Sequence, residues 1–366
     1  ISGTSAGAMN AVALAQGWTT GGAEGARASL NAFWEAVADS TPFELDLLHS
    51  LNGLNGAADG SLPGPMHMML SLTRLFSPYQ LNPFDLNPLR DVVEARFDFE
   101  RIRSQCRLRL FIAATQVRTG KVRLFHTPEL SADALLASAC LPTLHHAVEI
   151  DGEAYWDGGF TANPAVYPLI YDCTTPDILL VLLNPLRHPD APRSADDIAH
   201  RSMELGFSTT FLREMRTLAQ ARAYMQEGSG WLPRGRLERK LAGLRFHLLE
   251  AEELADAGKG SKLNATRAFL HELRDLGRAR AARWIRQHRA DVGRRETVEG
   301  KCRRASLGDA GGDAASGQAT RRSRSGQLRV GGRPTSVMPE VVPVGAAGMS
   351  TVAWPLTCKE RSKAVR

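Results

Sequence analysis

Apolar residues recur at helical spacing in several parts of this 366-residue chain. Ala8–Gln16 is an apolar run of good helix formers, and in Ala23–Asp39 the residues Leu30, Phe33 and Val37 fall on one helical face. Asn87-Pro88 supplies a capping residue and a first-turn proline for a helix that ends near Arg96. Three further helices are predicted over Ser131–Cys140, Ser194–Met225 and Asn264–Arg289.

Short apolar and β-branched runs between turn signals predict strands. The predicted strands are Ile1–Ser2, Leu108–Val117, Lys121–His126, Ala147–Ile150, Glu153–Trp156, Ile178–Leu183 and Arg245–Leu249. Ile178–Leu183 is apolar throughout, which is typical of a central strand covered on both faces. Strands that alternate with helices indicate a three-layer α/β domain with a mostly parallel central sheet.

Two regions interrupt this alternation. Ser50–Pro65 is rich in Gly, Asn and Pro and is predicted to be a surface loop. Pro65–Phe76, which contains three methionines, is predicted to be a core helix, with an apolar flap as the alternative.

The last 67 residues differ in composition from the rest of the chain. Residues 300–366 are dominated by Gly, Ser, Arg and Ala, retain a single aromatic residue, Trp354, and show no period. Such a segment buries too little apolar surface to fold. We therefore expect a folded domain over residues 1–299 and a disordered basic tail over 300–366, which is native, a fusion or the product of a shifted reading frame.

The net charge of +6 resides in that tail. Residues 300–366 hold twelve Lys or Arg against four Asp or Glu, a charge of +8, so residues 1–299 carry −2. The high pI therefore gives no reason to expect a nucleic-acid partner. The five cysteines are scattered and lack metal-ligand spacing, which indicates free thiols in a reducing compartment, and no run of 18 apolar residues is present. We expect a cytoplasmic protein without a metal, a cofactor or an obligate protein partner.

Gly3-Thr4-Ser5-Ala6-Gly7 carries the first candidate chemistry. A serine between a strand end and a helix, with a glycine two residues away on each side, is typical of a nucleophile elbow. A Cβ at Gly3 or Gly7 would strike the neighbouring strand or helix. The turn would expose the Ser5 hydroxyl above a helix N-terminus, where the Ala6 N–H is a candidate oxyanion donor. The alternative is a glycine-rich turn that only caps the helix.

A serine hydroxyl needs a base, and Asp157-Gly158-Gly159 provides the best candidate. Here an aspartate ends an apolar strand, and two glycines allow the backbone to turn and another segment to approach closely. Taken alone, this motif is more typical of a hairpin-end aspartate that bonds its own backbone. Together with the elbow, it favours a general base at Asp157.

These motifs resemble those of the patatin-like phospholipases, over about residues 1–299. The family's serine motif matches residues 3–7, its Asp-Gly-Gly motif matches residues 157–159, and its Ala-Ser-x-x-x-Pro pattern matches Ala137–Pro142. Asn163-Pro164 adds the extension found in bacterial members. The resemblance implies an α/β-hydrolase-related fold and a carboxylic ester hydrolase of the phospholipase A type. Its substrate would be a lipid or small ester, Ser5 its nucleophile and Asp157 its base.

The family's glycine-rich oxyanion loop lies upstream of the elbow, and no such segment precedes Ser5 in this sequence. We therefore expect an N-terminally truncated domain with weak or no activity, because the loss of one oxyanion donor alone costs about 10²–10³ in rate.

Two other functions stay open. One is an α/β-hydrolase with Ser-Asp-His order, in which His188 or His200 completes a triad. The other is a non-catalytic acyl-chain or lipid binder whose basic tail contacts anionic membranes, in which case the protein would be peripheral at the membrane. The paired His145-His146 precedes Asp157 and is predicted to lie in a loop or at a hairpin edge.

Overall fold

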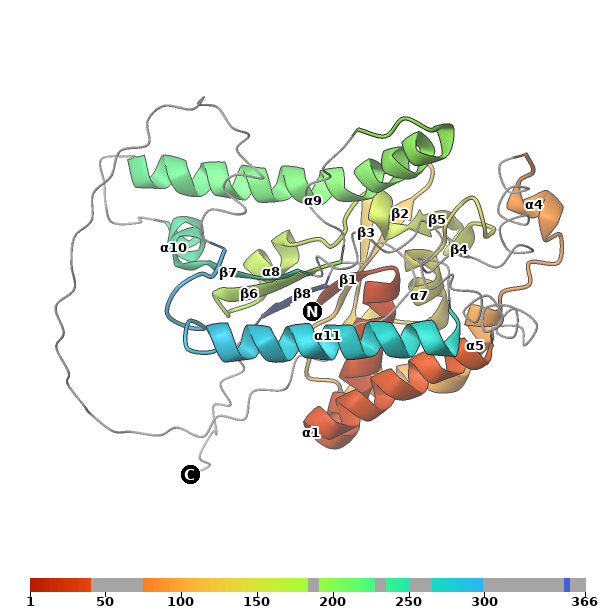
Figure 1. Cartoon of the computed structure of the whole chain (residues 1–366), viewed down its shortest axis with the longest axis horizontal. Helices are drawn as coiled ribbons and strands as arrows, with labels where there is room; N and C mark the ends of the chain where they lie inside the picture. Colours follow the sequence, from red (N-terminus) through yellow and green to blue (C-terminus); the bar gives the residue numbers. More distant parts are fainter. Residues whose placement is uncertain (41–74, 184–190, 228–234, 251–264, 299–351, 356–366) are drawn as a thin grey trace.

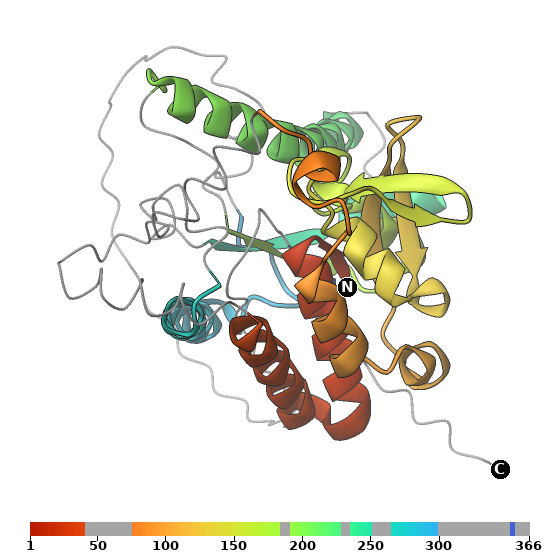
Figure 2. The same cartoon turned by 90° about the vertical axis from the view of Figure 1, so that its right-hand side faces the viewer.

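The computed structural model describes residues 1–40, 75–183, 191–227, 235–250, 265–298 and 352–355. A mixed sheet lies between α9 on one side and α1 and α11 on the other (Figures 1 and 2). The strands are β1 (Ser2–Thr4), β2 (Phe111–Gln116), β3 (Val122–His126), β4 (Val148–Ile150), β5 (Glu153–Asp157), β6 (Asp177–Leu182), β7 (Arg245–Glu250) and β8 (Val352–Pro355). The helices are α1 (Ala6–Asp39), α4 (Pro78–Leu81), α5 (Pro88–Arg96), α6 (Phe99–Gln105), α7 (Ala132–Ser138), α8 (Tyr167–Asp172), α9 (Ala195–Glu227), α10 (Arg236–Gly243) and α11 (Arg267–His288), with 3₁₀ turns η1 (Thr127–Glu129) and η2 (Gly158–Phe160).

The strand order is β4-β5-β2-β1-β8-β6-β7, and β3 pairs with β2. β1 is parallel to β2 and β6 is parallel to β7, whereas β8 runs antiparallel to both β1 and β6. Because β8 opposes both of its neighbours, β1, β2, β6 and β7 all point the same way. These four strands form the parallel framework of a three-layer α/β fold, and the predicted fold class is confirmed.

β1 and β5 share one edge of β2. β3 occupies the opposite edge over Phe111–Thr115, so β1 and β5 lie end to end along the same edge. β1 stops where Thr4 faces Ala113, and the antiparallel β5 arrives where Asp157 faces Ala114. The residue after β1 and the last residue of β5 are therefore brought together by sheet register alone.

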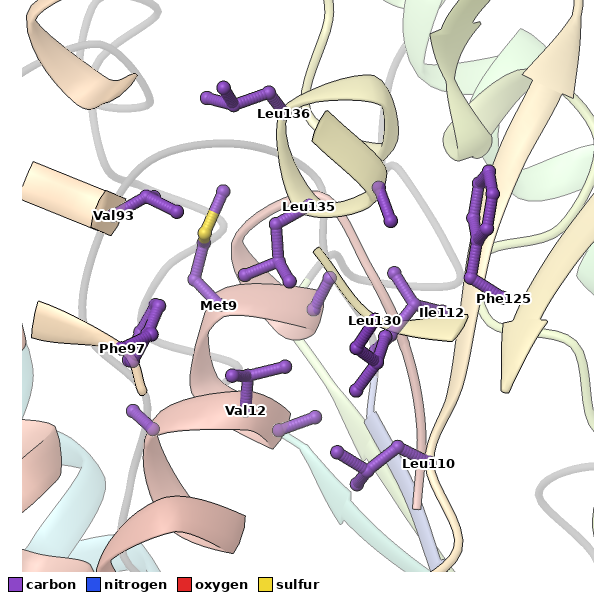
Figure 3. Close-up of a cluster of buried hydrophobic side chains, with 14 of the residues drawn as sticks. Met9, Val12, Val93, Phe97, Leu110, Ile112, Phe125, Leu130, Leu135 and Leu136 are labelled. Atoms are coloured by element: carbon purple, nitrogen blue, oxygen red, sulfur yellow. The ribbon is translucent and has the colours of Figure 1, made fainter. Parts of the chain in front are cut away.

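Alternating side chains of β2 divide the core into two layers. Leu110, Ile112 and Ala114 belong to a cluster built with α1, α5 and α7, while Phe111 packs with α8 and α9 on the opposite face. Figure 3 shows Met9 and Val12 of α1 meeting Leu135 of α7 over β2. This packing anchors the first turns of α1, just below the end of β1.

Most of the predicted elements are confirmed, with two differences. The helices predicted over Ala8–Gln16 and Ala23–Asp39 form one element, α1, kinked where Gly21 and Gly22 leave helical geometry. The short helices α6, α8 and α10 are not predicted from the sequence. The predicted loop at Ser50–Pro65 and most of the methionine-rich segment Pro65–Phe76 lie outside the described residues.

The structure describes one short stretch of the tail. Val352–Pro355, inside the segment expected to be disordered, forms β8 between β1 and β6. Val-Ala-Trp-Pro is apolar at all four positions, and the strands on both sides supply hydrogen-bond partners for its extended backbone. The rest of 300–366 lies outside the described residues. Within the described ranges, no helix is both long enough and apolar enough to cross a membrane.

Candidate active site

Ser5 is the sharp turn between β1 and α1. Its backbone has φ 56° and ψ −127°, a left-handed conformation that is rare for a residue with a side chain. The Ser5 carbonyl accepts hydrogen bonds from the N–H groups of Ala8 and Met9, at 2.8 and 3.2 Å, so the helix starts immediately after the serine. Ser5 is 8% exposed. The geometry is that of a nucleophile elbow.

The glycines of this motif are required by close backbone approach. A Cβ on Gly3 would lie 2.5 Å from the Gly7 carbonyl oxygen, well inside van der Waals contact. The strand and the first turn of the helix thus pass each other at a distance that only glycine permits at residue 3. This contact explains the glycine at residue 3.

Asp157 ends β5 and is 1% exposed. Its N–H donates to the Cys140 carbonyl at 2.7 Å, and its own carbonyl accepts from the Thr115 hydroxyl at 2.8 Å. Its Oδ1 accepts the Gly159 N–H at 2.7 Å. Main chain and side chain are therefore both fixed.

Gly158 and Gly159 allow the chain to turn away behind Asp157. A Cβ on Gly158 would lie 2.1 Å from the Ala113 carbonyl oxygen, and one on Gly159 would overlap the ring of Phe207. β2 and α9 press on this turn from two sides, so neither residue has room for a side chain. The close packing of β2 and α9 around this turn fixes the backbone next to the Asp157 carboxyl group.

Burial raises the pKa of Asp157 to about 7, despite the opposing effects of the Gly159 N–H and of the nearby Ser5 hydroxyl. The carboxyl group is thus exchangeable between its acid and base forms near neutral pH, as a proton acceptor in catalysis requires. Ser5 and Asp157 are 152 positions apart in the sequence and lie next to each other in the structure.

The first turn of α1 lies directly behind Ser5. The first N–H groups of an α-helix have no acceptor within the helix, and they sit at the positive end of its dipole. The N–H groups of Ala8 and Met9 bind the Ser5 carbonyl, whereas that of Ala6 belongs to the open start of the helix. The Ala6 N–H therefore stays the candidate oxyanion donor.

Ser138, in the Ala-Ser-x-x-x-Pro motif, is fully buried and touches the elbow: the Ser5 N–H donates to Ser138 Oγ at 3.0 Å. The contacts made by Cys140 and Thr115 are not predicted from the sequence. In the first contact the acceptor is the Cys140 carbonyl, and in the second it is the Asp157 carbonyl. Every residue has a carbonyl group, so the residue type gives no signal for such contacts.

In the described part of the chain, no hydrogen bond joins a histidine to Ser5 or Asp157. His145 and His146 lie in the loop between α7 and β4, as expected. His146 stacks on Tyr79, and burial lowers the pKa of His145. His188 lies outside the described residues, as does the side chain of His200. Among the described residues, no group of three or more His, Cys, Asp or Glu side chains could hold a metal ion.

Comparison with known proteins gives a family match over the N-terminal part of the chain. No curated protein matches the sequence. Residues 1–170 match the family described as patatin-like phospholipase, and this range contains Ser5, Ser138 and the Asp157-Gly158-Gly159 turn. The chain is thus similar to the patatin-like phospholipases over residues 1–170, somewhat less than half of its length.

Proposed function

We propose that this protein is a serine lipid acyl hydrolase that cleaves carboxylic esters with a Ser5–Asp157 dyad through an acyl-enzyme. The observation that carries the proposal is the elbow serine beside a buried carboxyl group whose pKa is raised to about 7. A carboxylate with that pKa accepts a proton far more readily than an ordinary aspartate.

The cycle uses two residues, a backbone N–H and water. Ser5 Oγ attacks the ester carbonyl carbon while its proton passes to the Asp157 carboxylate, and the Ala6 N–H stabilises the oxyanion. The intermediate collapses, and the leaving alkoxide takes the proton from Asp157. Water then attacks the acyl-enzyme, gives a proton to Asp157 and releases the fatty acid, and Ser5 recovers its proton.

The weakness of the base favours esters as substrates. Even at a pKa near 7, a carboxylate is a far weaker base than the serine alkoxide, so the leaving group must depart easily. An alcohol leaves more readily than an amine. Carboxylic esters therefore fit this site better than amides.

Exposed apolar side chains on the segment around α4 favour a lipid. The segment around α4 exposes Leu75, Phe76, Phe84 and Leu86, the last two at 84% and 70%. This segment is attached to the loop that follows Cys140: the Tyr79 hydroxyl accepts the Ala147 N–H at 3.2 Å, and the Tyr79 ring stacks on His146. Acyl chains and a membrane surface are the partners that such side chains suit.

Hydrolysis of short-chain p-nitrophenyl esters and of phospholipid vesicles, with mass mapping after organophosphonate labelling, tests the proposal. We expect weak ester hydrolysis that Ser5→Ala abolishes, and label on Ser5 but not on Ser138. The variants His188→Ala and His200→Ala should keep their activity, which separates the dyad from a triad. Label on another serine, or full activity in Ser5→Ala, would overturn the proposal.

A further inference from the structure

The end of α7 contacts both members of the proposed dyad through their backbone N–H groups. Ser138, the last residue of the helix, accepts from Ser5, and Cys140, two residues later, accepts from Asp157. The contacts link the elbow and the end of β5 to one three-residue segment, Ser138–Cys140, which we name the α7 turn.

The contact with Ser5 supports a conformation that is costly by itself. A left-handed backbone at a residue with a side chain is strained and persists only where the surroundings impose it. Ser5 precedes the first helical residue, so its N–H has no acceptor within α1. Ser138 Oγ supplies one at 3.0 Å in a fully buried position, where an unpaired N–H would be expensive.

The contact with Asp157 is short and comes from the main chain. The Asp157 N–H donates to the Cys140 carbonyl at 2.7 Å, at the point where β5 has run past the end of its pairing with β4. It fixes the backbone from which the carboxyl group projects. The Asp157 side chain is then oriented by the Gly159 N–H.

The α7 turn is itself rigid. The Ala139 N–H donates to Leu136 at 3.1 Å, and the Cys140 N–H to Ala137 at 3.4 Å. The buried Cys140 thiol donates to the His146 carbonyl at 3.0 Å, which closes the following loop. Because the turn is held on both sides, it fixes the position of Ser5 relative to Asp157.

We propose that the α7 turn is the positioning element of the dyad, with Ser138 as a positioning residue that holds Ser5 in its left-handed conformation through the backbone. This inference rests on the proposed function, since it assigns no chemistry to Ser138 itself. A displacement of about 1 Å in a reacting group can cost about 10²-fold in rate, so the loss of this hydrogen bond reaches kcat without any contact between Ser138 and substrate.

Ser138→Ala tests the inference, with Ser131→Ala as its matched control. Ser131 caps the other end of the same helix, where its Oγ accepts the Ala134 N–H at 3.1 Å, away from the dyad. Each variant removes one side-chain acceptor of a backbone N–H, that of Ser5 in Ser138→Ala and that of Ala134 in Ser131→Ala. Melting temperature, kcat and KM on a short-chain ester, and the rate of organophosphonate labelling at Ser5 are measured for each.

We expect Ser138→Ala to lower kcat and the labelling rate about 10-fold to 100-fold with KM nearly unchanged. Ser131→Ala should lower the melting temperature while leaving kcat within about 2-fold, since it removes only a helix cap. Equal effects of the two variants on kcat, or an unchanged labelling rate in Ser138→Ala, would overturn the inference.

Ser138→Cys covers the case in which the alanine variant does not fold. The thiol is close to the hydroxyl in size but a weak acceptor, so we expect a folded protein with an intermediate kcat. A folded Ser138→Cys with wild-type kcat would contradict the inference. Ser5→Ala separates the two proposals. If Ser5→Ala keeps full activity, the proposed dyad is wrong. If Ser5→Ala is inactive while Ser138→Ala is fully active, the dyad stands and only the positioning role of Ser138 is refuted.

Discussion

Asp157 and Asp177 are both 1% exposed, yet their surroundings move their pKa values in opposite directions. Asp157 ends β5 beside Ser5, and burial raises its pKa to about 7. Asp177 begins β6; burial alone would raise its pKa too, but hydrogen bonds from Arg245, Gly293 and His247 lower it to about 2.

The difference lies in the partners. Two Arg245 nitrogens donate to the two Asp177 oxygens at 2.8 and 2.6 Å, and Nε2 of the buried His247 donates to Asp177 Oδ1 at 3.0 Å. Asp157 receives one backbone N–H and has the Ser5 hydroxyl nearby. A buried carboxylate with a cation stabilises the fold, whereas one without a cation is available to exchange a proton. Asp177 is therefore the structural counterpart against which the role of Asp157 can be measured.

The largest expected effect is the loss of activity in Asp157→Asn. The amide is nearly isosteric and can still accept the Gly159 N–H, but it cannot take the Ser5 proton. Ester hydrolysis should fall by about 10²–10⁴-fold while the far-UV circular dichroism stays unchanged. A variant that keeps more than about a tenth of the wild-type rate would show that Asp157 is not the base.

Asp177→Asn should produce the converse result. It leaves Arg245 without its carboxylate, and breaking a buried ion pair costs about 3–5 kcal/mol in the free energy of unfolding. Denaturant unfolding should show this loss, while kcat per folded molecule stays near wild type. A stable but inactive Asp177→Asn would reverse the roles assigned to the two aspartates.

The pH dependence of stability should separate the two sites by sign. The raised pKa of Asp157 means that the folded protein binds this proton more tightly than the unfolded chain does, so stability falls as pH rises from about 4 to about 7. Asp157→Asn should thus gain stability relative to wild type over that range.

The lowered pKa of Asp177 stabilises the fold above about pH 4, and this contribution is lost as pH falls toward 2. Urea midpoints at pH 2, 4, 5.5 and 7.5 measure both contributions, and a difference between Asp157→Asn and wild type that does not change with pH would argue against the raised pKa.

A smaller effect is expected at β8, which joins the half of the sheet that carries Asp157 to the half that carries Asp177. A chain that ends at residue 351 lacks β8, so β1 and β6 lose the ladder between them. Its melting temperature should fall by several degrees relative to a chain that ends at Pro355, which keeps the strand. Identical melting curves for the two chains would show that β8 contributes nothing to the fold.

The sequence predicts the framework and both proposed catalytic residues because their signals are local. Ser5 and Asp157 stand in glycine-marked turns at strand ends, and the strands around them have clear apolar patterns. β8 could not be predicted, because Val352–Pro355 pairs through its backbone in a gap created by distant strands. The contacts of Cys140 and the opposite pKa values of Asp157 and Asp177 depend on tertiary neighbours, which the local sequence does not encode.

The pH dependence of organophosphonate labelling at Ser5 tests the central claim most directly, because it reports the proton transfer without substrate binding or product release. The dyad predicts a labelling rate that rises with pH through an apparent pKa of about 7, as the Asp157 carboxyl group ionises. In Asp157→Asn the rate should be low at every pH and should lack this transition. A transition near pH 7 that persists in Asp157→Asn would contradict the account and assign the base to another group.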